Sequence, residues 1–213
     1  MFKRGCSMSD YITIKQQASD EFVEKRSRFI GHIKPVTTRE QAEEFIAEIK
    51  SKYWDARHNV YAYVLREGNF RKYSDDGEPQ GTAGVPVLEV MLKENVTDCV
   101  VVVTRYFGGI LLGTGGLTRA YSKSARIAIA AGEIQNMVLC DKLKISCDYS
   151  FYGRLGSLLG EMEALILDTD FSEDVTVSFA LKKSETGRLH ARLADLSNAR
   201  FAAQSIGEEY YSM

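Results

Sequence analysis

The chain has 213 residues, of which 45% are hydrophobic and 26% are charged, and its net charge is −2. These values are ordinary for a compact globular protein, and three prolines exclude a long proline-rich linker. The nearly balanced charge excludes binding of nucleic acid through the overall electrostatic field, so any such contact needs a local basic patch.

The sequence carries no sign of export or of a membrane span. No apolar run approaches the roughly 20 residues that cross a bilayer, and the start, MFKRGCSMSD, lacks the apolar core of a signal peptide. The four cysteines show no CxxC spacing and the three histidines lie far apart, so neither a disulfide framework nor a metal site is indicated. We therefore expect a cytoplasmic protein without membrane contact, metal or cofactor, with residues 1–10 as a leader or disordered start.

Hydrophobic periodicity predicts the elements of the first half. Alternating apolar and polar residues indicate a strand at 11–15 and a second extended, basic run at about 21–35. Thr38 followed by Gln41 is a capping-box signal, and the helical spacing after it predicts an amphipathic helix to about Lys52. A strand at 59–66, a turn at 67–69 and a return strand at 70–73 follow.

A loop rich in glycine and proline, at 74–86, carries the three acids Asp75, Asp76 and Glu78 and follows His58 in the chain. Such oxygen ligands suit Mg²⁺ or Ca²⁺, but the spacing does not match an EF-hand loop, and turns favour Asp, Gly and Pro for conformational reasons. We therefore assign these side chains to a secondary binding loop and predict no metal. The apolar runs 85–92 and 99–104 are both predicted to be strands.

The segment 104–126 is distinguished by its glycines. It follows a buried strand, contains five of the 17 glycines and continues as a helix from Leu117. Helical spacing places Arg119, Lys123 and Arg126 on the face opposite the apolar one. The segment therefore predicts a strand, a glycine-rich loop and a helix with one basic face.

This arrangement suits an anion. Glycines let backbone N–H groups approach a ligand, and the first turn of a helix leaves N–H groups free beside the positive end of the helix dipole. The spacing matches neither GxxxxGK[ST] nor GxGxxG. The alternative therefore stays open that the glycines only form a tight connection and the cations only solvate a helix face. The predicted ligand-binding residues are Arg105, Tyr106, Gly108, Gly109, Gly113, Thr114, Gly115, Gly116, Arg119, Lys123 and Arg126.

The pattern restarts after Gly132. It predicts a strand at 137–148, a helix at 152–162 with Ser150 as its N-cap, strands at 165–169 and 175–181, a helix at 186–196 and a strand at 203–211. The order β-α-β-β-α-β is that of a ferredoxin-like sandwich. We therefore expect an α+β protein with two domains, at 11–134 and 137–213.

Four blocks of the first domain resemble one protein family. They are KRSRFIGHIKPV (25–36), DARHNVYAY (55–63), SDDGEPQGTAGVPVLEV (74–90) and VVVTRYFGGILLGTGGLTRAYSKSAR (101–126). Their order is that of the IMPACT/YigZ family of conserved, largely uncharacterised proteins, and the rest of the chain resembles the small C-terminal domain of the bacterial members. Arg57 and Val60 stand where threonine and a cysteine or small residue are common in the family.

The resemblance implies a fold for each domain. The first should be a β-sheet backed by two helices, like the second domain of a small-subunit ribosomal protein, and the second should be like domain V of elongation factor G. The resemblance also implies eukaryotic relatives linked to the control of translation initiation through a ribosome-associated regulator of a stress kinase. The first fold is shared with small-molecule kinases that hold a phosphate on a glycine-rich loop, so fold alone does not decide the function.

Two functions follow from these observations. No pattern such as GxSxG or HExxH joins the acids, hydroxyls and histidines into a catalytic set, so we name no catalytic residue and expect a non-enzymatic factor linked to translation. Its expected partner is RNA, the ribosome or a translation-associated protein, held by the glycine-rich loop and the basic helix face. The alternative is a phosphate- or nucleotide-binding enzyme that uses the same loop. The oligomeric state is left open.

Overall fold

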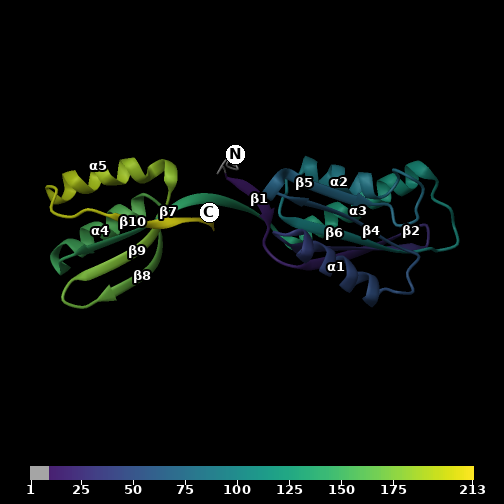
Figure 1. The fold of residues 1–213 in the computed structure, drawn as a ribbon, viewed down its shortest axis with the longest axis horizontal. Coiled ribbons are helices and arrows are strands. Elements are labelled where there is room, and N and C mark those ends of the chain that lie inside the picture. The colour runs from purple at the N-terminus through teal and green to yellow at the C-terminus, as the bar shows by residue number, and fades with distance from the viewer. Residues whose placement is uncertain (1–9) are drawn as a thin grey trace, which may run out of the picture. The chain divides into compact units, whose positions relative to one another are not determined.

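The computed structural model describes residues 10–213, which form two compact units (Figure 1). Unit 1 covers Tyr11–Asn136, and unit 2 contains Met137–Met213. Nearly all of the expected leader falls on residues 1–9, outside the described residues. The residue bounds expected for the two domains stay a prediction. Within residues 10–213, no helix is both long enough and apolar enough to cross a bilayer.

Unit 1 is built around a five-stranded antiparallel sheet in the order β2-β3-β6-β4-β5. Its strands are β2 (Ala18–Glu24), β3 (Ser27–Pro35), β4 (His58–Leu65), β5 (Phe70–Ser74) and β6 (Cys99–Tyr106), and a 3-10 turn η1 (Glu67–Asn69) connects β4 and β5. The short strand β1 (Tyr11–Ile14) precedes them in the chain and is not part of this sheet. Strand β6 lies in the middle of the sheet, and every residue of it except the last is buried.

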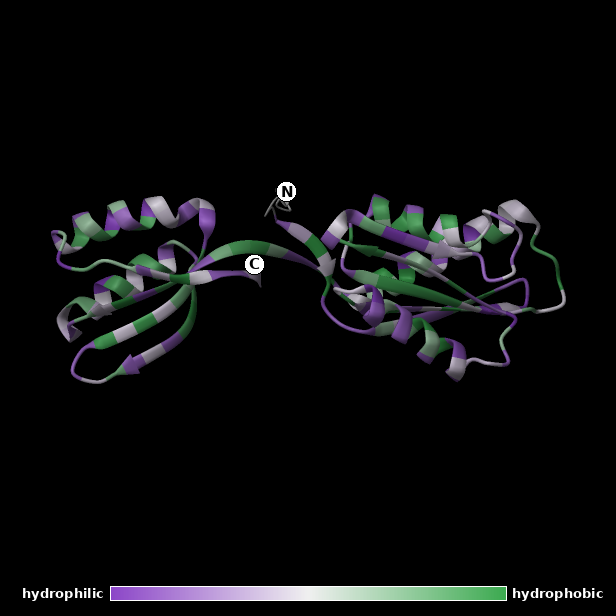
Figure 2. Ribbon diagram, viewed as in Figure 1, coloured by the Kyte–Doolittle hydropathy of each residue, from purple (hydrophilic) through white to green (hydrophobic). Residues whose placement is uncertain are grey.

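Three helices cover the two faces of this sheet. They are α1 (Arg39–Lys52), α2 (Gly84–Lys93) and α3 (Thr114–Gly132). Successive residues of a strand point to opposite faces, so Val101 and Val103 of β6 join the core of α2 and α3, whereas Val100 and Val102 join the core of α1. The apolar colour of the central strands in Figure 2 reflects this burial on both sides. Two helices therefore back one face, as the resemblance implies, and α1 covers the other.

The prediction of a strand at 85–92 is wrong, because this run forms the helix α2. Its buried residues Val87, Val90 and Met91 repeat with helical spacing. Pro86 lies in the first turn, where a proline removes no intrahelical hydrogen bond. A short run rich in valine does not separate helix from strand, and the deciding contacts come from elsewhere in the chain.

The extended run predicted at about 21–35 is also not continuous. Lys25 and Arg26 form a two-residue turn between β2 and β3, with φ values of 44° and 66°. Such hairpin turns favour Asn and Gly, and neither residue stands here, so the sequence carried no turn signal. The turn matters because it brings two cations to the edge of the glycine-rich segment.

Unit 2 has the βαββαβ order that the sequence predicts. Its elements are β7 (Ile134–Cys147), α4 (Tyr149–Glu161), β8 (Leu165–Phe171), β9 (Val175–Lys182), a 3-10 turn η2 (Lys183–Glu185), α5 (Thr186–Ser197) and β10 (Gln204–Ser212). The strands pair antiparallel in the order β8-β9-β7-β10, and both helices contribute to one apolar core. These pairings confirm the mixed α+β fold with a ferredoxin-like second unit.

The N-cap of α4 differs from the prediction. Asp148, and not Ser150, occupies the cap, and its Oδ1 accepts a hydrogen bond of 2.9 Å from the backbone N–H of Phe151. The Ser150 hydroxyl instead donates to the same carboxylate oxygen at 2.6 Å. Asp and Ser are comparable N-caps, so the sequence alone did not decide between them.

Candidate functional site

The glycine loop, residues 107–113, connects β6 to α3. Gly109 and Gly113 have φ values of 81° and 71°, in the left-handed region that favours glycine. Gly108 packs against the β2–β3 turn, because a Cβ at this position would overlap the backbone of Arg26. The backbone N–H of Gly108 also donates to the Ser27 hydroxyl at 3.2 Å. The loop therefore needs glycine in order to follow this close path.

Helix α3 begins at Thr114, earlier than the predicted start at Leu117. Gly113 is the N-cap, and no side chain in the described part of the chain caps the helix. The N–H groups of Thr114, Gly115 and Gly116 therefore lie in the first turn, where the helix itself offers no acceptor and the dipole adds partial positive charge. This helix start is open to an anionic group.

Arg105 of β6 and Glu78 of the loop 74–86 form a buried ion pair. Glu78 Oε1 accepts hydrogen bonds from Arg105 Nη1 and from the hydroxyl of Tyr121 on α3, the latter at 2.8 Å. Burial raises the pKa of the Tyr121 hydroxyl, and the neighbouring Glu78 charge raises it further. The side chains of Arg105 and Glu78 are only 7% and 4% exposed, so water screens the pair poorly.

His58, at the start of β4, completes this cluster. Its Nδ1 lies 2.8 Å from the carbonyl oxygen of Asp76, which can only accept, so Nδ1 carries the proton. Its Nε2 lies 3.8 Å from Glu78 Oε1. This contact is an ion pair only when the ring carries both protons.

The remaining acids of the loop 74–86 have structural partners. Asp76 accepts a hydrogen bond of 2.7 Å from the backbone N–H of Asn59 and one of 2.6 Å from Lys50 Nζ. Asp75 accepts from the backbone N–H groups of Ala83 at 3.1 Å and Gly84 at 2.8 Å at the start of α2, and from that of Gly81 at 2.9 Å in the loop just before it. Within residues 10–213, no group of three or more His, Cys, Asp or Glu side chains is placed to hold a metal ion.

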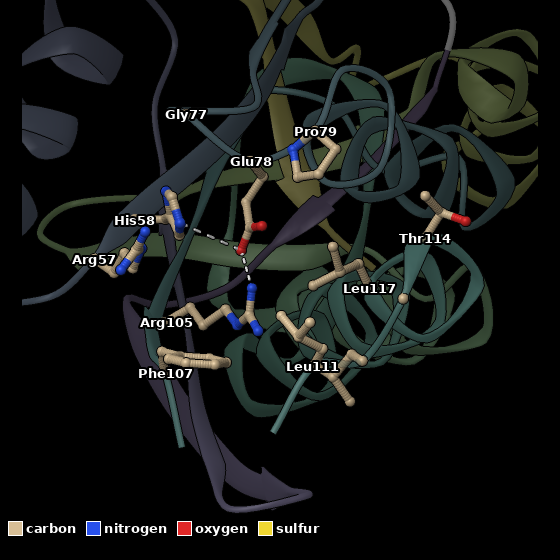
Figure 3. Close-up of a pocket in the computed structure, with 12 residues that line it drawn as sticks. Arg57, His58, Gly77, Glu78, Pro79, Arg105, Phe107, Leu111, Thr114 and Leu117 are labelled. Carbon is tan, nitrogen blue, oxygen red and sulfur yellow. Dashed lines mark hydrogen bonds and ion pairs between the residues drawn. The ribbon is translucent and has the colours of Figure 1, made fainter. Parts of the chain in front are cut away.

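A cavity of about 400 Å³, which we call the Arg105 pocket, opens beside the Glu78 cluster (Figure 3). One wall is polar and consists of Arg57, His58, Glu78 and Arg105. The apolar part of the lining, the apolar wall, consists of Pro79 beside Glu78, Phe107 beside Arg105, and the leucines Leu111, Leu112 and Leu117. The start of α3 borders the pocket through Gly113 and Thr114. The pocket thus combines charged groups, an open helix N-terminus and an apolar surface.

A second cavity of about 200 Å³, the basic groove, lies between the β2–β3 turn and α3. It is lined by Lys25, Arg119 and Lys123, together with the acid Glu24 and the apolar Leu112. Among residues 10–213, none of the three cations forms an ion pair. Leu112 also lines the Arg105 pocket, so the glycine loop separates the two cavities.

Six of the eleven predicted ligand-binding residues line one of these cavities, and Gly108 is among the five that do not. The Arg105 pocket receives Arg105, Gly113 and Thr114 together with His58 and Glu78 of the secondary loop, and the basic groove receives Gly116, Arg119 and Lys123. Arg126 is exposed, but it lines neither cavity. Gly109 and Gly115 also line neither cavity. Tyr106 lies on the opposite face of the sheet from Arg105, where its hydroxyl donates to Asp55 Oδ1 at 2.8 Å.

Two of the cations at these cavities, Arg57 and Lys25, were not assigned to a site from the sequence. Arg57 reaches the Arg105 pocket because its backbone N–H donates to the carbonyl of Arg105 at 3.2 Å, which extends the pairing of β4 with β6. Lys25 reaches the basic groove through the β2–β3 turn. Strand pairing and an unsignalled turn create both placements, so residue spacing alone offered no signal for them.

Comparison with known families covers both units. The Impact N-terminal domain matches residues 25–129, which contain the whole lining of the Arg105 pocket, and a domain of unknown function, DUF1949, matches residues 145–200. A crystal structure described as that of a hypothetical protein is similar with a TM-score of 0.60 and 30% identity, over 94% of this chain and 98% of that chain.

Relatives in bacteria match over most of their length. The chain is 40% identical over 194 residues to the IMPACT family member YvyE of Bacillus subtilis, which covers 91% of this chain and 89% of YvyE. It is 33% identical over 187 residues to the IMPACT family member YigZ of Escherichia coli, and the match covers 86% of this chain and 92% of YigZ. Protein IMPACT of Rattus norvegicus is 36% identical over 94 residues, which are 42% of this chain and 30% of that protein. The chain therefore belongs to the IMPACT family.

Proposed function

We propose that this protein is a non-enzymatic factor that binds RNA on the ribosome and acts in translation. The observation that carries the proposal is the basic groove, where three cations from two elements lie without ion-pair partners among the described residues. Other cations of unit 1, such as Lys50 and Arg28, are paired with Asp76 and Glu21. Unpaired cations keep their charge available for phosphate groups, which dominate the affinity of proteins for RNA.

The geometry of the groove suits a sugar-phosphate backbone. Arg119 and Lys123 lie one helical turn apart on α3, and Lys25 faces them from the β2–β3 turn. The groove contains three cations against one carboxylate, that of Glu24. Beyond it, the glycine loop presents Phe107, which is 42% exposed, as a surface on which an unpaired base can stack.

Two further observations support a role in translation in the cytoplasm. Membership in the IMPACT family supports the connection, because the resemblance implies eukaryotic relatives that act through a ribosome-associated regulator. Cys99, Cys140 and Cys147 are buried free thiols, in keeping with a reducing compartment. A protein partner on the ribosome would not bind through contacts to phosphate groups. The change of affinity with salt concentration, measured in the experiment below, therefore distinguishes a protein partner from RNA.

Co-sedimentation of the full chain with ribosomes at increasing salt tests the proposal. The double variant Arg119→Ala/Lys123→Ala should weaken the association and lower the salt slope by about 1.4, which is about 0.7 for each lost contact to single-stranded RNA. The matched control is Lys93→Ala/Lys144→Ala, which removes the same charge from exposed positions outside the groove and should leave both quantities unchanged.

Two outcomes would contradict the proposal. If the Arg119→Ala/Lys123→Ala variant sediments with ribosomes as the unchanged protein does, the basic groove is not the binding surface. If the control variant loses as much association, the attraction is a general charge effect. Thermal melting of both variants shows that they are folded, because exposed substitutions of this kind change stability by only about 0.5 kcal/mol.

A further inference from the structure

We propose that the Arg105 pocket binds a small phosphate ester with hydroxyl groups and a planar aromatic ring, which is the chemistry of a nucleoside monophosphate. The cavity of about 400 Å³ lies within the usual range for small-molecule sites. The glycine loop separates it from the basic groove, and the two cavities share only Leu112 among their lining residues.

The first argument is the unsatisfied guanidinium of Arg105. This side chain is 7% exposed, and its hydrogen bond to a described residue is the one from Nη1 to Glu78. Its Nε is buried and has no hydrogen-bond partner within residues 10–213. Figure 3 shows the guanidinium between Glu78 and the leucines of the apolar wall. Buried donors without an acceptor are costly, and the Arg105 side chain lines the pocket, so an anionic oxygen there would add a charged partner for an under-satisfied guanidinium.

The second argument is the start of α3 at the same pocket. Gly113 and Thr114 line the cavity, and no described side chain caps the helix. The first-turn N–H groups offer several donors at the positive end of the helix dipole. Several donors in one place match the several oxygens of a phosphate better than the two oxygens of a carboxylate.

The third argument concerns the free oxygen of Glu78. Arg105, Tyr121 and His58 all approach Oε1, whereas Oε2 has no hydrogen-bond partner in the described part of the chain. In Figure 3 the second oxygen points toward Leu117, away from His58 and Arg105. A carboxylate oxygen in this position accepts a hydrogen bond from a ligand, so the ligand should carry hydroxyl groups as well as a phosphate.

The apolar wall indicates the rest of the ligand. Phe107 is 42% exposed and Leu111 is 83% exposed, which leaves a large apolar surface beside the charged groups. A planar ring would cover this surface and stack on Phe107. Inorganic phosphate alone would leave the wall in contact with water, so we expect it to bind more weakly than a nucleoside monophosphate.

Calorimetric titration of the full chain with AMP, GMP, CMP and UMP tests the proposal. We expect at least one of them to bind with a single site, and inorganic phosphate and adenosine to bind at least about tenfold more weakly, because each lacks one part of the recognised chemistry. The Thr114→Asp variant should weaken nucleotide binding by at least about tenfold, because it places a carboxylate beside the phosphate. Its melting temperature should not fall, because an acid in the first turn suits the helix dipole.

The matched control is Gly187→Asp. It places the same charge in the first turn of α5 in unit 2, where a Cβ would meet no atom within 4 Å. Nucleotide affinity should be unchanged in this variant, whereas Phe107→Ala should weaken nucleotide binding and leave the binding of inorganic phosphate unaffected. The proposal is overturned if no nucleotide binds at up to about 1 mM. It is also overturned if the Thr114→Asp variant binds the nucleotide as tightly as the unchanged protein does. A third contrary result is that L-leucine, which offers a carboxylate and an apolar side chain, binds while the phosphate esters do not.

Discussion

Replacing Glu78 with leucine should strongly destabilise unit 1. The change leaves the guanidinium of Arg105 buried and without its carboxylate, and removing one partner of a buried ion pair typically costs about 3–5 kcal/mol. The Tyr121 hydroxyl loses its acceptor at the same time, and an unsatisfied buried hydroxyl costs about 1–3 kcal/mol. The two costs overlap, because both side chains lose the same carboxylate oxygen. We therefore expect a loss of at least about 3 kcal/mol, a large share of the 5–15 kcal/mol by which a protein is usually stable.

The assay must observe unit 1 alone, because a chain with two units need not unfold in one step. Urea unfolding followed through backbone amide NMR signals of unit 1 gives its free energy of unfolding. The informative comparison is between Glu78→Leu and the double variant Glu78→Leu/Arg105→Met. Replacing both charges by apolar side chains of similar size is often nearly neutral, so the double variant should recover most of the loss.

Two results would refute this reasoning. A loss below about 1 kcal/mol for Glu78→Leu would mean that Arg105 finds water or another acceptor, and that the ion pair is not shielded. Equal losses in the single and double variants would assign the cost to packing and not to the unpaired charge. Either result would also weaken the argument that Arg105 offers unsatisfied donors to a ligand.

Three further predictions test other contacts. Gly108→Ala should lower the melting temperature, because its Cβ would overlap the backbone of Arg26; an unchanged value would mean that the glycine loop moves freely. Asp75→Ala should cost about 1–2 kcal/mol in urea unfolding, because three N–H groups at the start of α2 lose their acceptor. Burial lowers the pKa of His32 to about 4 from the ordinary 6.5. As the pH falls, the unfolded chain therefore takes up a proton on His32 before the folded chain does. About 3 kcal/mol of the free energy of unfolding, present above pH 6.5, should be lost as the pH falls from 6.5 to 4. Urea unfolding of His32→Gln should lack this pH dependence.

Much of the fold could be predicted from periodicity because its elements are amphipathic. Helix α1 has its buried residues at helical spacing and is capped by Thr38, so local signals agree. Helix α2 could not be predicted, because its valines suit a strand equally well. The carboxylate that satisfies its first N–H groups also gives no local signal, because it belongs to Asp75, which lies eight residues before Ala83 and nine before Gly84. Local pattern predicts an element well only where its stabilising partners are also local.

The site was predictable in part for the same reason. The glycines and the cations of α3 are close in sequence, so their association with an anion could be inferred. Arg105 and Tyr106 lie on opposite faces of the sheet because successive side chains of a strand alternate between its faces. This separation was predictable from the sequence, although both residues were assigned to one site. The meeting of Glu78, Arg105 and Tyr121 could not be predicted, because these residues come from a loop, a strand and a helix that are joined only by tertiary packing.

The two proposed binding regions use different atoms of the same helix. The start of α3 borders the Arg105 pocket through Gly113 and Thr114, whereas the side chains of Arg119 and Lys123 line the basic groove. A nucleotide at the helix start and an RNA strand along its side therefore do not compete for the same donors. Leu112 of the glycine loop lines both cavities, so a ligand that fixes the loop on one side also changes the wall of the other. Any resulting coupling must be reciprocal, with each ligand changing the affinity of the other by the same factor.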